Sequence, residues 1–144
     1  MTNLTLAQAS LIADRALAKG RDRNFKPLTV AVLDAGGQMK VLKREDGSSL
    51  LRPEIANGKA WGVLGMGLGG RTLAARAQAA PAFMAALSDA SGGRMIPVPG
   101  GVLIRDAAGE IIGSVGISGD TSENDELCAI AGIEAAGLKD DTGS

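Results

Sequence analysis

The sequence predicts an α+β fold with antiparallel strands rather than a doubly wound parallel sheet. Two stretches rich in branched residues are each divided by a short glycine-containing turn, and hairpins of this kind pair their strands antiparallel. Helical periodicity occurs before, between and after these hairpins, so the predicted order is helix, hairpin, helices, hairpin, helix. Helices that are kept apart from the hairpins along the chain indicate a separate helical layer.

The first part of the chain is predicted to form a helix and then a hairpin. Thr5 and Gln8 make a capping box with Leu4 as its hydrophobic staple, and apolar residues then recur at helical spacing as far as Gly20. The turn at residues 35–38 contains two glycines, which supply the positive φ that a tight hairpin needs. The expected elements are a helix at residues 6–20 and strands at residues 28–34 and 39–44, the second of which ends at Asp46-Gly47.

The rest of the chain is predicted to be helical first and then to repeat the pattern of hairpin and helix. Pro53 and Pro81 suit the first turns of helices. Gly113 and Gly116 in the last strand indicate a bulge, or a backbone pressed against a ligand or a neighbouring element. Ser122, followed by Asp125, resembles another capping box. The expected elements are helices at residues 53–61, 72–80, 81–90 and 122–136, and strands at residues 102–106 and 110–118.

Length and composition favour one soluble domain over residues 1–144, with residues 4–138 ordered and a polar tail, residues 139–144, that frays. Fifteen Lys and Arg balance sixteen Asp and Glu, and two Phe, one Trp and no Tyr leave little to stack on bases, so no nucleic-acid partner is expected. No membrane association is expected, because no apolar run reaches the roughly 18 residues of a membrane span. The first 20 residues lack a signal-peptide pattern, and one cysteine cannot form an internal disulfide, so we expect a cytoplasmic protein.

The chain contains no histidine, which excludes Ser-His-Asp and Cys-His catalysis and histidine-ligated metals, and no metal site is predicted. Arg44 ends a strand and is either a clamp for a carboxylate or a plain surface charge. Lys59 lies among small residues and is a base, an anion contact or a surface lysine. Cys128 lies on an apolar helix face, which favours a buried structural thiol. The glycine-rich residues 65–70 are better explained as a helix connection than as a phosphate loop, because no Gly-Lys-Ser/Thr follows.

The turn at residues 97–101, with the sequence PVPGG, is singled out on physical grounds. Prolines such as Pro99 stiffen it, and Gly100 and Gly101 leave consecutive amides uncovered, so the turn either binds an oxyanion or carboxylate or enters a hairpin with unusual dihedrals. Ser118 has no histidine partner that would make it a nucleophile. Asp125 either caps the last helix or faces a cleft.

Four segments in this order resemble one family over roughly residues 4–138: VAVLDAGGQMKVLKREDGS, EIANGKAWG, PVPGGVLIRDAAGEIIGSVGISG and END. They resemble the haem-degrading domain family, which includes GlcG-like and HbpS-like proteins and the C-terminal domain of PduO. The resemblance implies an antiparallel sheet of about five strands with helices on both faces, and assembly as dimers or larger homo-oligomers. It also implies a ligand pocket, which in several relatives takes haem or corrinoid-related tetrapyrroles.

The positions that match the family's motifs carry its expected site. They are Asp34, Gly36, Gly37, Arg44, Asp46, Gly47, Lys59, Gly100, Gly101, Ser118, Gly119 and Asp125. Gln38 stands where the family commonly has a histidine after the glycine pair. Because glutamine is not a serviceable iron ligand, Met, Cys or Lys would have to hold a haem iron here.

Two functions follow from these residues, and a purely structural oligomer is the third alternative. The first is a small-molecule-binding protein that requires no cofactor and whose pocket takes an anionic, carboxylate-bearing ligand, or a tetrapyrrole as the resemblance implies. The residues expected to bind that ligand are Arg44, Lys59, Pro99, Gly100, Gly101, Gln38 and Ser118. The second is a cofactor-free isomerase, tautomerase or lyase of a small carbonyl acid. Arg44 would then orient the carboxylate and Lys59 or Asp125 would move the proton.

Overall fold

The structure is a computed structural model that describes residues 3–144; Met1 and Thr2, which the predicted domain includes, lie outside the described residues. The helices are α1 (Leu6–Asp22), α2 (Arg52–Met66), α3 (Gly70–Ala79), α4 (Pro81–Ala90) and α5 (Ser122–Ala135). The strands are β1 (Thr29–Asp34), β2 (Met39–Arg44), β3 (Gly101–Arg105), β4 (Ile111–Ser118) and β5 (Lys139–Asp141). This order confirms the predicted α+β class.

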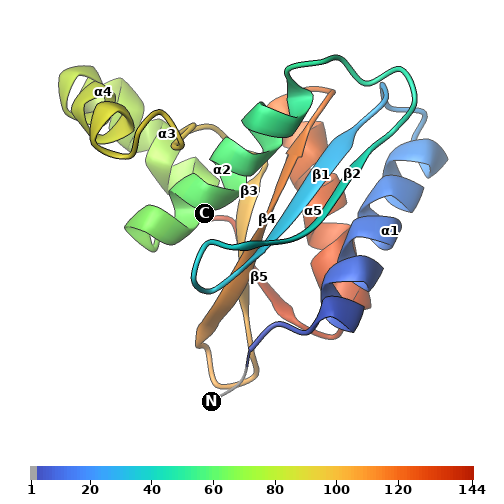
Figure 1. Cartoon of the computed structure of the whole chain (residues 1–144). Coiled ribbons are helices and arrows are strands. Elements are labelled where there is room, and N and C mark those ends of the chain that lie inside the picture. Colours follow the sequence, from blue (N-terminus) through green and yellow to red (C-terminus); the bar gives the residue numbers. More distant parts are fainter. Residues whose placement is uncertain (1–2) are drawn as a thin grey trace.

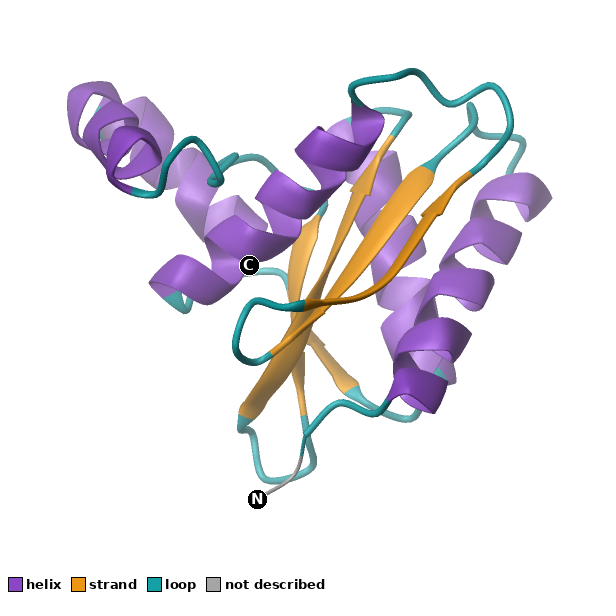
Figure 2. Cartoon of the chain, viewed as in Figure 1, coloured by secondary structure: helices purple, strands orange, loops and turns teal. Residues whose placement is uncertain are grey.

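The five strands form one sheet in the order β2-β1-β4-β3-β5, and every neighbouring pair is antiparallel. Helices α1 and α5 cover one face of the sheet, and α2 lies across the other face (Figures 1 and 2). The α3–α4 pair leads away from the sheet beyond α2 (Figure 1). The expected sheet of about five strands with helices on both faces is therefore confirmed. Within residues 3–144, no helix is long and apolar enough to cross a bilayer.

Local sequence signals explain the first half of the chain. Both hydrogen bonds of the capping box form, because the Thr5 hydroxyl accepts from the Gln8 amide while the Gln8 side chain accepts from the Thr5 amide. In the turn between β1 and β2, Asp34 Oδ1 accepts the amide hydrogens of Gly36 and Gln38, each at 3.0 Å. Gly37 has a φ of 79°, as the glycine pair predicted.

The larger hydrophobic core lies between the sheet and the α1–α5 layer. It contains branched residues from the sheet, such as Val30, Val32 and Ile117, and small residues from the helices, such as Ala13 and Ala129. A second, smaller cluster lies on the other face. Its buried members are Val63, Leu73, Met84, Met95 and Leu103.

Helix α2 approaches the sheet so closely that the strands beneath it must carry glycine. A Cβ atom built on Gly116 would lie 1.9 Å from the carbonyl oxygen of Ala56, and one on Gly101 would lie 2.3 Å from that of Lys59. Ser114 Oγ donates to the Ala60 carbonyl oxygen at 2.7 Å across the same contact. Of the readings that the sequence left open for Gly116, a backbone pressed against a neighbouring element is confirmed.

Three expectations need correction. The tail that was expected to fray, residues 139–144, begins with an ordered strand. Lys139–Asp141 form β5, which pairs with the edge of β3. Helix α2 extends five residues beyond Trp61 and ends where Gly67, with a φ of 67°, caps it. The N-cap of α5 is Thr121 rather than Ser122, since the Thr121 hydroxyl accepts the amide hydrogen of Asn124. The last two errors concern the ends of helices, where local sequence is least decisive, whereas β5 depends on its pairing with β3.

Candidate functional site

Lys59 and Asp125 meet in the interior, although they come from helices on opposite faces of the sheet. Lys59 Nζ donates to Asp125 Oδ2 at 3.1 Å and to the Ile117 carbonyl oxygen at 2.8 Å. The other oxygen, Asp125 Oδ1, accepts the amide hydrogen of Asp120 at 3.0 Å. The two side chains are only 4% and 1% exposed, so this pair ties α2 to α5 past the end of β4.

Burial is the main cause of the pKa shifts of Lys59 and Asp125. Removal from water lowers the pKa of the Lys59 ammonium and raises the pKa of the Asp125 carboxyl, and the attraction between the two groups opposes both shifts. Neither side chain lines any of the hollows described below. Asp125 is thus not the N-cap of α5, and it does not line a hollow described here.

The PVPGG turn is packed against Lys59 rather than left open. A Cβ on Gly100, whose φ is 109°, would lie 2.9 Å from Lys59 Nζ. Gly101 opens β3 opposite Gly116, and the Gly100 carbonyl oxygen accepts the amide hydrogen of Ile117. Both glycines are buried and Pro99 is half-buried. These positions explain the two glycines by close backbone packing, and none of the three residues lines a described hollow.

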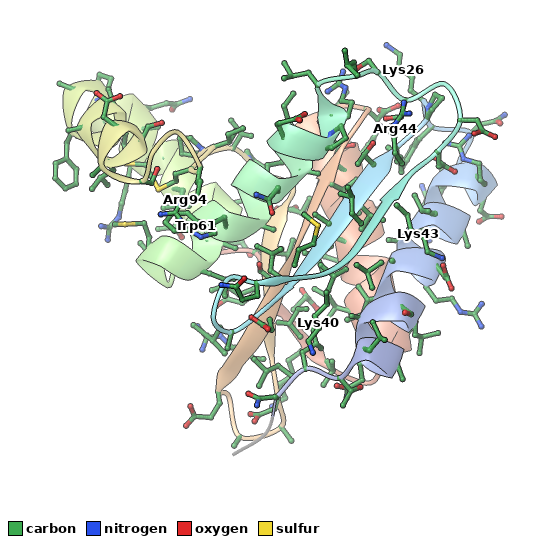
Figure 3. The ribbon with its side chains drawn as sticks, in the orientation of Figure 1. Lys26, Lys40, Lys43, Arg44, Trp61 and Arg94 are labelled. Carbon is green, nitrogen blue, oxygen red and sulfur yellow. The ribbon has the colours of Figure 1, made fainter. Side chains whose placement is uncertain are left out.

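Arg44 and Ser118 lie in one row at the end of the sheet, because Thr29 pairs with both of them. Arg44 donates to the Ser48 carbonyl oxygen at 2.8 Å. The buried Ser118 hydroxyl accepts from the Arg52 guanidinium at 3.0 Å. This end of the sheet (Figure 3, near the labels of Lys26 and Arg44) therefore gathers several cationic side chains around two strand ends.

Two neighbouring hollows, which share Pro27, open at this end. The larger, of about 430 Å³, has charges of both signs in its wall; it is lined by Arg21, Pro27, Arg44, Glu45 and Asp46. The smaller, of about 190 Å³, has two cations, two serines and no carboxylate in its wall. It is lined by Lys26, Pro27, Gly47, Ser48, Ser49, Arg52 and Gly119, and we call it the Arg52 hollow.

Gln38 lies at the other end of β2 from Arg44. It lines a separate hollow of about 220 Å³ together with Asn3, Leu4, Asp34, Ala35, Gly36 and Lys40. The residues that the sequence grouped into one ligand site are therefore divided. Arg44 and Ser118 lie at one sheet end, Lys59, Gly100, Gly101 and Asp125 are buried, and Gln38 lies in the hairpin turn.

Sequence reasoning missed Arg52, Lys26 and the two serines, Ser48 and Ser49. A signal existed for Arg52, since it precedes Pro53 at the start of a predicted helix, close to the Asp46-Gly47 turn that ends the hairpin. Sequence reasoning also missed the pair of Arg71 with the buried Glu126. The Arg71 guanidinium donates three hydrogen bonds of 2.7–3.0 Å to that carboxylate. Arg71 is therefore engaged by Glu126 rather than free to bind a phosphate.

The donors in this chain do not fit a haem that is ligated by histidine or thiolate. The chain has neither His nor Tyr, and burial raises the pKa of the Cys128 thiol to about 11, which keeps it protonated. Among the hollows described, only that beside Trp61 is lined by methionine, with Met66 and Met95 around about 220 Å³. Within residues 3–144, no group of three or more Cys, Asp and Glu side chains is placed to hold a metal ion.

The state of Cys128 gives a simple prediction. Because the thiol is buried and has a raised pKa, we expect the folded protein to resist iodoacetamide at mildly alkaline pH and to react once urea unfolds it. Mass spectrometry of the alkylated fraction over time measures this. Complete alkylation of the folded protein near neutral pH would show that the thiol is exposed.

Known proteins match this chain over nearly its whole length, both in sequence and in structure. The family described as "Haem degrading protein HbpS-like" matches residues 4–134. The "Uncharacterized 15.0 kDa protein in dhaT-dhaS intergenic region" of Citrobacter freundii is 28% identical over 134 residues, which cover 93% of this chain and 92% of the relative. The crystal structure of the PduOC:Heme complex matches with a TM-score of 0.86 at 25% identity, covering 99% of this chain and 100% of the other. That of HbpS matches with a TM-score of 0.81 at 28% identity, covering 93% and 90%. The chain therefore belongs to the HbpS-like haem-degrading protein family.

Proposed function

We propose that this protein binds a small anionic molecule, of the carboxylate or phosphate class, in the Arg52 hollow. The observation that carries the proposal is the composition of its wall, in which Lys26 and Arg52 are accompanied by two serines and no carboxylate takes part. Two cations in the wall of one hollow favour an anion, and a guanidinium binds a carboxylate in a bidentate manner. The family-like glycines Gly47 and Gly119 lie in the same wall.

Arg52 is held in place for this role. It is half-buried, and its bond to the Ser118 hydroxyl engages one guanidinium nitrogen, while no other hydrogen bond of the group is made within residues 3–144. The nearby Asp120 carboxylate is already occupied, because it accepts from the amides of Lys26 and Thr121 and from the Asn124 side chain. These hydrogen bonds lower the pKa of Asp120, and the bond from the Lys26 amide has the largest effect. The negative charge of Asp120 is therefore stabilised by these neighbouring donors.

The size of the hollow limits the ligand. Pockets for drug-sized molecules span roughly 300–1,000 Å³, whereas the Arg52 hollow encloses about 190 Å³. We therefore infer a compact acid rather than a tetrapyrrole at this position. The structural match to the PduOC:Heme complex makes haem the second ligand class to test in this chain. The enzyme alternative has no support from geometry, because Lys59 and Asp125 form a buried pair that lines none of the described hollows.

Replacement of Arg52 tests the proposal. Calorimetric titration with oxalate, malonate and inorganic phosphate should show saturable binding to the wild type, and Arg52→Ala should weaken it at least about tenfold, since a charge-assisted hydrogen bond is lost. Arg15→Ala, which removes an exposed arginine of α1, is the matched control and should leave affinity unchanged. Equal affinity in wild type and Arg52→Ala would overturn the assignment. Hemin, followed by its absorbance, is titrated in parallel; saturable hemin binding without any small-anion binding would replace this proposal.

Self-association, which the resemblance implies, stays a prediction. Several large apolar side chains are exposed to solvent on a single chain, and these are the surfaces that a homo-oligomer would cover. The most exposed are Leu50 at 89%, Leu51 at 63%, Leu6 at 59% and Phe83 at 58%.

A further inference from the structure

A second hollow, of different chemistry, lies between α2 and α4. It encloses about 220 Å³ and is lined by Trp61, Gly65, Met66, Leu87, Ala90, Ser91, Arg94 and Met95. Trp61 is nine residues beyond Arg52 on α2, about 14 Å along the helix axis, so this site is distinct from the Arg52 hollow. We call it the Trp61 hollow.

The indole of Trp61 packs against three neighbours, which are Gly37, Gly65 and Arg94. A Cβ on Gly37 would lie 3.2 Å from Nε1 at the pyrrole edge, and a Cβ on Gly65 would lie 2.9 Å from Cζ3 at the benzo edge. The Arg94 guanidinium stacks on the ring at 4.1 Å from its centroid, and Figure 3 shows the two side chains together. Both glycines therefore leave room that the Trp61 ring fills.

Arg94 is itself oriented for an anion. Its Nε donates to the Ser91 carbonyl oxygen at 2.6 Å, and no other hydrogen bond of the guanidinium is made within residues 3–144. The rest of the wall is apolar or already satisfied, since the Ser91 hydroxyl donates to the Ser88 carbonyl oxygen. The hollow thus offers one positive charge beside an indole and two thioethers.

From this arrangement we propose that the Trp61 hollow binds a flat aromatic monoanion. Ring carbons of such a ligand pack against the indole and against the thioethers of Met66 and Met95, which make favourable contacts with aromatic rings. Its acid group pairs with Arg94, the only ionisable side chain in the wall. A neutral aromatic molecule would make the same ring contacts but no ion pair with Arg94, so it should bind more weakly than the anion. The inference does not depend on the Arg52 hollow.

The chain offers a direct readout, because Trp61 is its only tryptophan and it contains no tyrosine. The probes are benzenesulfonate and the neutral benzenesulfonamide, which share one ring and differ in charge, and both are compact enough for a hollow of about 220 Å³. The fluorescence of Trp61 should change saturably with both probes in the wild type, with the anion bound more tightly. Arg94→Met should weaken sulfonate binding about tenfold and leave the neutral probe unchanged.

Two further variants make the result decisive. Arg76→Met removes an exposed arginine of α3 outside the hollow and should change neither probe. Arg94→Lys keeps the positive charge but removes the planar guanidinium that can donate two parallel hydrogen bonds. It should therefore give intermediate affinity for the sulfonate. An unchanged preference for the anion in Arg94→Met, or an equal loss in Arg76→Met, would overturn the proposal. Because Arg94 is exposed, circular dichroism should show that its variants fold as the wild type does.

Discussion

Replacing Asp125 with alanine is expected to lower the free energy of unfolding by about 3–5 kcal/mol, because the ammonium of Lys59 is then buried without its counter-ion. Lys59 would keep only the Ile117 carbonyl oxygen as an acceptor, and the Asp120 amide would lose the acceptor that Asp125 supplies. At about 2–4 °C per kcal/mol for a chain of this size, the melting temperature should fall by roughly 10 °C. Urea denaturation followed by circular dichroism measures the loss.

An exposed ion pair in the same protein provides the matched control. Asp14 pairs with Lys43, and their side chains are 57% and 46% exposed, so Asp14→Ala should cost about 0–1 kcal/mol. The double variant Lys59→Met with Asp125→Leu should recover much of the loss, since both charges are then removed from the interior. If Asp125→Ala cost no more than Asp14→Ala, the Lys59–Asp125 pair would have to be solvated in solution.

Local signals explain why much of the fold could be predicted. The capping box at Thr5, the glycine pair before Gln38 and the prolines at α2 and α4 each act within a few residues of chain. A capping hydrogen bond or a positive φ is therefore visible in the sequence itself. The strand pairs joined by short turns, β1–β2 and β3–β4, follow from the same local chemistry.

Long-range contacts explain what could not be predicted. Lys59 and Asp125 are 66 residues apart, and no periodicity relates them. Strand β5 has only three residues and exists because the edge of β3 accepts it. The division of the site was open to sequence reasoning, however. Gln38 directly precedes a six-residue strand that ends at Arg44, and six residues at about 3.3 Å each separate the two by roughly 20 Å.

Gly116 carries the second large prediction, because it decides how closely α2 can approach the sheet. A Cβ at this position would lie 1.9 Å from the Ala56 carbonyl oxygen and 2.7 Å from the Ala60 amide nitrogen. Both atoms belong to the backbone of α2, which cannot rotate away as a side chain would. We expect Gly116→Ala to lower the free energy of unfolding by about 3 kcal/mol or more, at the upper end of the overpacking range, measured by urea denaturation.

Gly36→Ala is the control that shows the effect of a glycine-to-alanine change where no steric clash results. Its added Cβ would make an ordinary contact, 3.4 Å from Asp34 Oδ1, and Gly36 does not have a left-handed φ. We expect an effect within about 1 kcal/mol there, since alanine also reduces the freedom of the unfolded chain. An equally small effect at Gly116 would mean that α2 can move outward at little cost. The Ser114 hydrogen bond to the Ala60 carbonyl oxygen and the bond from Lys59 to the Ile117 carbonyl oxygen would then not hold α2 at its observed distance. A large effect at Gly116 alone would show that the close approach of α2, which lets Lys59 reach past β4 to Asp125, depends on glycine in the strand beneath it.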